Sequence, residues 1–79
     1  MMPQSDEDRL RLLVRQAEEA YSAMYDAPDP SSATARYSDA KECLHTAIGL
    51  ARTLGETELA TQLAERLAHI KAVFRSQFG

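Results

Sequence analysis

Apolar residues recur at the spacing of an α-helix in three stretches of the chain, and this periodicity constrains the fold more than any other sequence feature. No stretch alternates apolar and polar residues as a half-buried β-strand does. The prolines of Asp26-Ala-Pro-Asp-Pro30 end the first stretch, because proline lacks an N–H and disfavours helical geometry at the preceding residue. We therefore predict an all-α fold in a single domain of residues 1–79, with residues 1–4 and 78–79 frayed. The helices are expected over about residues 5–26, 32–54 and 57–77.

Local signals mark the ends of these helices. Ser5 is expected to cap the first helix by accepting a hydrogen bond from a backbone N–H of the first turn. Asp29 or Ser31 is expected to cap the second helix, and Gly55 stands where a left-handed residue commonly ends a helix. Thr57 is the predicted cap of the third helix. The second and third helices are thus expected to form a tight antiparallel hairpin.

Small residues lie inside the apolar pattern of the second and third helices, where larger side chains would bury more surface. We interpret them as a seam at which these two helices approach to the short end of the usual separation of about 8–10 Å. The first helix is expected to lie across both. On this interpretation, replacing Ala47 with Leu overpacks the seam and costs about 1–3 kcal/mol of stability. The small residues are Ala40, Ala47 and Ala51 in the second helix and Ala60, Ala64 and Ala68 in the third.

Nine Lys and Arg residues against twelve Asp and Glu residues give a net charge of −3. That balance supplies no overall positive field, so we expect no nucleic acid partner. No apolar run reaches the roughly 18 residues of a membrane-spanning helix, and no membrane partner is expected. Because Cys43 is the single cysteine, an intramolecular disulfide is impossible. This favours a reducing, cytoplasmic location.

The segment from Tyr37 to Leu50 has a distinctive order of aromatic, small and large apolar residues. The residues in that order are Tyr37, Ala40, Leu44, Ala47 and Ile48. The pattern resembles the second helix of a tetratricopeptide repeat, and the residues that follow resemble the junction with the next repeat. The likeness covers about residues 37–70. It implies a helical hairpin plus one helix and a role in binding proteins or peptides, whereas a plain three-helix antiparallel bundle is the alternative interpretation.

Charged residues one helical turn apart predict surface ion pairs worth about 0.2–0.5 kcal/mol each. Glu7 has this spacing to Arg11, and Arg15 has it to both Glu18 and Glu19. We expect these pairs to decorate the solvated face of the first helix.

No set of residues with catalytic, cofactor-binding or metal-ligating spacing emerges from the sequence. Cys43 and His45 are two positions apart, hence about 200° around a helix, and cannot easily ligate one ion from the same face. We interpret Cys43 as a small apolar residue at the margin of the core. His69 follows Glu65 by four residues, which permits a surface pair but places no nucleophile beside it. We therefore expect no enzyme activity, no cofactor and no metal.

Apolar and aromatic side chains at the edges of the helices are the candidate contacts to a partner, because three short helices do not use all of this surface. We expect a small cytoplasmic protein–protein interaction module without catalytic activity, which binds a protein or peptide or a second copy of itself. The alternative is a structural or regulatory accessory bundle that acts as a homodimer or as a subunit of a larger complex. The candidate contact residues are Leu12, Tyr21, Tyr25 and Phe78.

Overall fold

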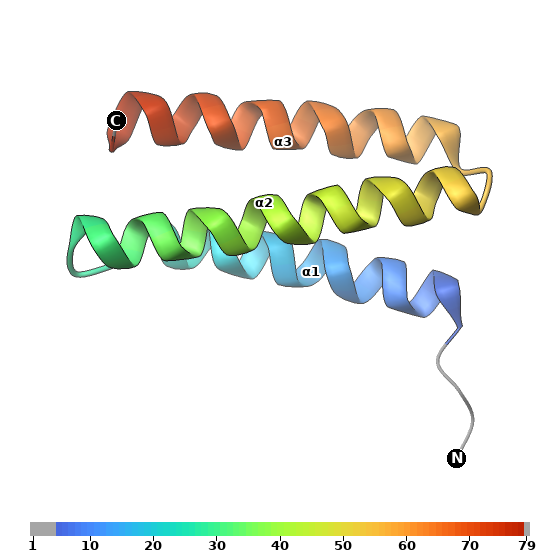
Figure 1. Ribbon diagram of the computed structural model, residues 1–79, viewed down its shortest axis with the longest axis horizontal. Coiled ribbons are helices and arrows are strands. Elements are labelled where there is room, and N and C mark those ends of the chain that lie inside the picture. Colours follow the sequence, from blue (N-terminus) through green and yellow to red (C-terminus); the bar gives the residue numbers. More distant parts are fainter. Residues whose placement is uncertain (1–4, 79) are drawn as a thin grey trace, which may run out of the picture.

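Three antiparallel helices make up the computed structural model, which describes residues 5–78 (Figure 1). They are α1 (Asp6–Tyr25), α2 (Pro30–Thr53) and α3 (Thr57–Gln77). The all-α prediction is confirmed, and residues 5–78 contain no strand. The predicted fraying covers residues 1–4 and 78–79, of which residues 1–4 and 79 lie outside the described part of the chain. Phe78 directly follows α3, and its backbone N–H donates to the Phe74 carbonyl at 2.8 Å.

The first two helices begin at side-chain caps. The backbone N–H of Asp8 donates to Ser5 Oγ at 3.1 Å, so Ser5 caps α1 as predicted. The backbone N–H of Ser32 donates to Asp29 Oδ1 at 2.7 Å, and this cap starts α2 at Pro30, two residues before the predicted position. Proline fits the first helical position because the N–H that it lacks would have no partner there. The loop between α1 and α2 is correspondingly short.

The connection between α2 and α3 depends on Gly55, whose φ of +78° confirms the predicted left-handed residue. The Gly55 N–H donates to the Arg52 carbonyl at 3.1 Å, and the Glu56 N–H donates to the Ala51 carbonyl at 2.8 Å. These two bonds form a Schellman motif. The predicted Thr57 cap is wrong: Glu56 is the N-cap residue, and it makes no side-chain capping bond. The Schellman turn, rather than a side chain, sets the start of α3.

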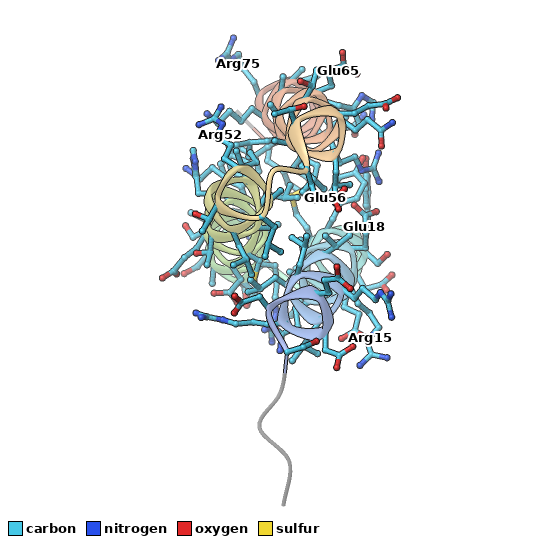
Figure 2. The ribbon with its side chains drawn as sticks, turned by 90° about the vertical axis from the view of Figure 1, so that its right-hand side faces the viewer. Arg15, Glu18, Arg52, Glu56, Glu65 and Arg75 are labelled. Atoms are coloured by element: carbon cyan, nitrogen blue, oxygen red, sulfur yellow. The ribbon has the colours of Figure 1, made fainter. Side chains whose placement is uncertain are left out.

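α2 lies between the other two helices. It packs along α1 and along α3, whereas the backbones of α1 and α3 come close to each other almost nowhere. Figure 2, which looks along the helices, shows α2 set to one side of the other two. The core therefore surrounds the inner face of α2. Its fully or nearly buried residues are Leu10, Ala17, Leu44, Ala47, Ile48, Ala51, Ala60, Leu63, Leu67 and Ile70.

The small residues of α2 are buried, whereas only Ala60 of the three in α3 is buried. Ala40, Ala47 and Ala51 are 0% exposed, as the predicted seam requires. Ala64 and Ala68 are exposed, so the predicted alanine ridge of α3 is wrong. α3 lies at the edge of the structure and meets α2 through larger side chains, which include Leu63 and Leu67 of the core. The closer backbone approach joins α1 with α2.

Candidate functional site

A groove of about 530 Å³ opens between the first half of α1 and the start of α3. Apolar side chains line it: Leu10 is buried, and Val14 and Leu59 are half-buried. The groove exists because α1 and α3 are both held by α2 and do not pack backbone to backbone. Its charged lining residues are Glu7, Arg11, Arg15 and Glu56. Figure 2 shows Arg15, Glu18 and Glu56 on this side, which we call the front face.

A two-point ion pair bridges α1 and α3 beyond the groove. Arg66 donates from Nε to Glu18 Oε2 at 2.9 Å and from Nη2 to Glu18 Oε1 at 2.6 Å. These hydrogen bonds lower the pKa of Glu18 below its ordinary value of 4.5 although burial opposes them, and they raise the pKa of Arg66. The pair fixes the spacing of the two helices at this level, since a bidentate carboxylate–guanidinium contact is geometrically specific.

Of the ion pairs predicted on α1, Arg15–Glu19 is confirmed and Glu7–Arg11 is not. Arg15 pairs with Glu19 at 3.9 Å, which leaves Glu18 for Arg66. Arg11 lies 3.9 Å from Asp8 rather than pairing with Glu7. The three other ion pairs of residues 5–78 join residues of the same helix. The Glu18–Arg66 contact spans 48 positions, and nothing local in the sequence marks it.

All five aromatic residues of the chain gather at one end of the molecule, where α1 and α3 end and α2 begins. Their ring centroids form a continuous series: Tyr21 to Tyr25 at 5.4 Å, Tyr25 to Phe78 at 6.4 Å, Phe78 to Phe74 at 5.5 Å, and Phe74 to Tyr37 at 3.9 Å. We call this series the aromatic cluster. Because each helix contributes to it, the cluster ties the three helices together at one end.

The two ends of the aromatic cluster differ in exposure. The rings of Tyr37 and Phe74 stack with an interplanar angle of 1°, and both residues are half-buried. Tyr25 is 51% exposed and Phe78 39%, and these are the large apolar residues that the described chain leaves in solvent. Such side chains are the usual anchors of protein interfaces. The buried end is therefore structural, and the exposed end is free to contact another molecule.

Tyr21 lies between the aromatic cluster and the Glu18–Arg66 ion pair, and polar groups surround it. Its hydroxyl lies 3.2 Å from that of Tyr25, and this hydrogen bond raises the pKa of Tyr21. The Arg66 guanidinium lies 4.9 Å from the Tyr21 ring centroid, a cation–π distance. The His69 ring lies 6.5 Å from the Tyr21 ring. Sequence reasoning assigned His69 no part in this site, because the contact crosses between helices.

The structure brings three of the four predicted contact residues together. Tyr21, Tyr25 and Phe78 belong to one cluster, although they come from α1 and from the residue that follows α3. Leu12 is half-buried on a different part of α1, among Asp8, Arg11 and Arg15. The sequence did not predict that Leu10 and Leu59 line one groove. In each helix taken alone, the residue has the spacing of an ordinary core residue.

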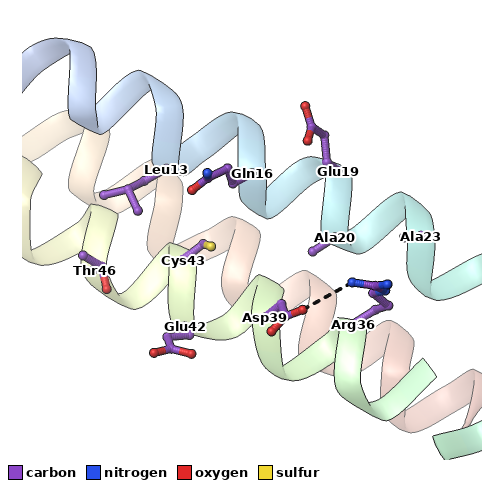
Figure 3. A pocket seen from close by; sticks show the side chains of 10 residues that line it. All are labelled: Leu13, Gln16, Glu19, Ala20, Ala23, Arg36, Asp39, Glu42, Cys43 and Thr46. Atoms are coloured by element: carbon purple, nitrogen blue, oxygen red, sulfur yellow. Dashed lines mark ion pairs between the residues drawn. The ribbon is translucent and has the colours of Figure 1, made fainter. Parts of the chain in front are cut away.

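A second groove, of about 540 Å³, lies along α1 and α2 (Figure 3). Arg36 and Asp39 form an ion pair of 3.7 Å in its wall, and Cys43 points toward α1. Burial raises the pKa of the Cys43 thiol, and the carboxylates of Asp39 and Glu42 raise it further. A thiol held in its protonated form is a poor nucleophile. Cys43 is therefore not activated as a nucleophile in this groove.

Within residues 5–78, no three His, Cys, Asp or Glu residues lie together as metal ligands. None of the described helices combines the length and apolar character needed to cross a membrane. Comparison with protein-family models, with curated proteins and with solved structures finds no match. The tetratricopeptide likeness of residues 37–70 therefore stays a prediction.

Proposed function

We propose that this chain is a protein–protein interaction module without catalytic activity, which binds an apolar segment of a partner protein along the front face. One observation carries the proposal: α1 and α3 diverge around a groove lined by Leu10, Val14 and Leu59, and the exposed rings of Tyr25 and Phe78 lie on the other side of the Glu18–Arg66 bridge. A concave apolar surface with aromatic anchors is typical of a peptide-binding site.

The resemblance to a tetratricopeptide repeat supports the same proposal, because α2 with its buried small residues would be the second helix of such a repeat. α1 and α3 would then be the first helices of successive repeats. We also propose that the protein acts in the cytoplasm, since Cys43 is the single cysteine of the chain.

Selection from a displayed peptide library tests this function without a known partner. Peptides are selected on the wild-type chain and then titrated by fluorescence anisotropy against Tyr25→Ser/Phe78→Ser, a variant whose circular dichroism is compared with the wild type. Binding is expected to weaken at least about tenfold, because truncating aromatic anchors typically costs more than 1 kcal/mol each.

Leu12→Ser is the matched control, since it also removes an apolar side chain from α1 but away from the aromatic cluster. It should change peptide affinity much less than the double variant does, because Leu12 is not part of the groove lining, although its neighbours Arg11 and Arg15 are. Selected peptides that bind the double variant as tightly as the wild type would contradict the proposal.

Self-association through the same exposed rings is the second candidate function, favoured by the solvent exposure of Tyr25 and Phe78. A homodimer would bury both rings of each copy. Sedimentation velocity at increasing protein concentration is then expected to show a dimer for the wild type and for Leu12→Ser, and a monomer for Tyr25→Ser/Phe78→Ser.

A further inference from the structure

The seam between α2 and α3 carries a positively charged strip on the side away from the front face. Lys41 and Arg52 of α2 and Lys71 and Arg75 of α3 form this strip, which we call the basic face. Figure 2 shows Arg52 and Arg75 on one side of the molecule and Glu18, Glu56 and Glu65 on the other. The face spans two helices and reaches the half-buried end of the aromatic cluster, where the Lys41 ammonium lies over the Tyr37 ring.

The register of α2 against α3 places the two lysines opposite each other. The Lys41 ammonium lies 4.5 Å from the Tyr37 ring centroid, and that ring stacks on Phe74. Because the two helices are antiparallel, one turn after Tyr37 on α2 corresponds to one turn before Phe74 on α3. Lys71 therefore lies across the seam from Lys41. Arg75 follows Lys71 by one turn, on the same side of α3.

Spacing along α2 puts Arg52 in the same row as Lys41. The two residues are three helical turns apart, which places their side chains on one face about 16 Å from each other. The basic face thus runs along much of the seam rather than forming a single point charge.

No acidic side chain neutralises these four cations. In residues 5–78, none of them lies within 4.0 Å of a carboxylate. The acidic residues within α2, Asp39 and Glu42, line the groove toward α1 instead. A chain with a net charge of −3 thus carries an uncompensated positive strip, which attracts negative charge locally.

Small side chains lie beside the cations. Ala64 is exposed on α3 and stands two turns before Lys71, and Ala68 is exposed one turn further on. Small residues allow a third helix to lie close to the surface, at the short end of the usual interhelical separation. Stabilisation of helix ends accounts for Arg52 and Arg75, which lie in the last turns of α2 and α3. It does not account for Lys41.

We propose that the basic face binds an acidic helix of a partner protein, laid along the α2–α3 seam with its carboxylates toward the four cations. Charge complementarity selects this occupant, and the alanines give it room. A nucleic acid fits the surface less well, since it is a long polyanion and the rest of the chain carries a net negative charge. The proposal concerns a surface separate from the front face and does not depend on the function proposed for it.

The probe for this site is a fluorescent synthetic amphipathic helix rich in Glu and Ala, titrated against the full chain by anisotropy. Lys71→Glu/Arg75→Glu is expected to weaken its binding about tenfold and to flatten the salt dependence. Arg9→Glu/Arg36→Glu makes the same change in net charge away from the basic face and should alter the affinity less than about twofold. Lys71→Ala/Arg75→Ala is a second variant in case the reversed charges reduce helicity, since alanine favours the helix. Its binding of the acidic helix should also weaken.

Three results would overturn the proposal: equal losses in the basic-face and control variants, binding of a charge-reversed Lys-rich helix as tight as that of the acidic helix, or tighter binding of single-stranded DNA than of the acidic helix. Tyr25→Ser/Phe78→Ser should bind the acidic helix as the wild type does. The two proposals are therefore tested by different variants, and either can fail without the other.

Discussion

α1 meets its two neighbours through opposite kinds of surface. Toward α2 it presents small side chains, and the backbones come close: Ala17 and Ala40 are both 0% exposed and lie at similar distances from the connecting loop. Toward α3 it presents long side chains, and contact depends on Glu18 with Arg66 and on aromatic rings. The first interface is closed at its centre, where the buried alanines meet, and the groove at its edge is lined largely by polar side chains such as Glu19 and Asp39. The second leaves a groove with an apolar lining, which makes that side the better candidate for binding an apolar segment.

The largest expected effect comes from enlarging a residue in the closed interface. Ala40→Leu should lower the free energy of unfolding by about 1–3 kcal/mol, because the added atoms have no space beside α1. Ala64→Leu makes the same chemical change at an exposed site of α3 and should alter stability by less than about 0.5 kcal/mol. Urea denaturation measures both. Equal losses would mean that the small residues of α2 do not set a close approach.

Two glycines allow the turn after α2 and the helix itself to be tested separately. Gly55 has a φ of +78°, so Gly55→Ala should cost about 1–2 kcal/mol of stability. Gly49 lies within α2 with no atom within 4 Å of an added Cβ, so Gly49→Ala should stabilise by about 0.5–1 kcal/mol. Thermal denaturation followed by circular dichroism measures the opposite signs, and a stabilising Gly55→Ala would show that the Schellman turn does not hold α3 in place.

The bridge between α1 and α3 should give a smaller, pH-dependent contribution. Glu18 and Arg66 remain 42% and 36% exposed, so solvent screening limits the loss in Glu18→Gln to about 0.5–1 kcal/mol at neutral pH. The pKa of Glu18 is lower in the folded state than its ordinary 4.5, so the contribution is complete above that value and is lost as pH falls through the folded pKa. Unfolding free energies of wild type and variant should therefore converge in acid.

Glu19→Gln is the control for this comparison, because Glu19 pairs only with Arg15 of its own helix at 3.9 Å. It should destabilise less than Glu18→Gln. A wild-type advantage over Glu18→Gln that persists unchanged into acid would exclude the Glu18 carboxylate as its source.

The exposed rings should contribute least to stability. Tyr25→Ser/Phe78→Ser is expected to stay within about 1 kcal/mol of the wild type, since Tyr25 is 51% exposed and Phe78 39%. Tyr37→Ala, which removes the half-buried ring stacked on Phe74, should cost more. Chemical denaturation of the two variants side by side checks the order. A large loss in the double variant would make the exposed rings structural rather than available for binding.

The sequence predicted most of what depends on neighbours along the chain. Ser5 and Gly55 act through backbone groups a few residues away, so their roles could be inferred without a tertiary structure. Helical periodicity also identified the buried alanines of α2. It did not show which neighbour they face, because a helical wheel gives the direction of a side chain and not the identity of the opposing helix. Ala64 and Ala68 were misassigned for this reason.

The candidate site was predictable only in part. Tyr25 and Phe78 could be singled out as apolar residues at element ends, but their meeting required the return of α3 alongside α1. The Glu18–Arg66 pair left no local signal, and Glu18 had a competing partner one turn away. Contacts between side chains that are distant in the sequence can be identified only from the arrangement of the three helices.

The central position of α2 also determines how the molecule can be divided. Residues 6–53 and residues 30–77 are two helical hairpins that share one helix. A fragment that lacks α3 retains one whole interface, and a fragment that lacks α1 retains the other. Loss of α2 removes both at once, so we expect truncation from either terminus to be less damaging than interruption of α2.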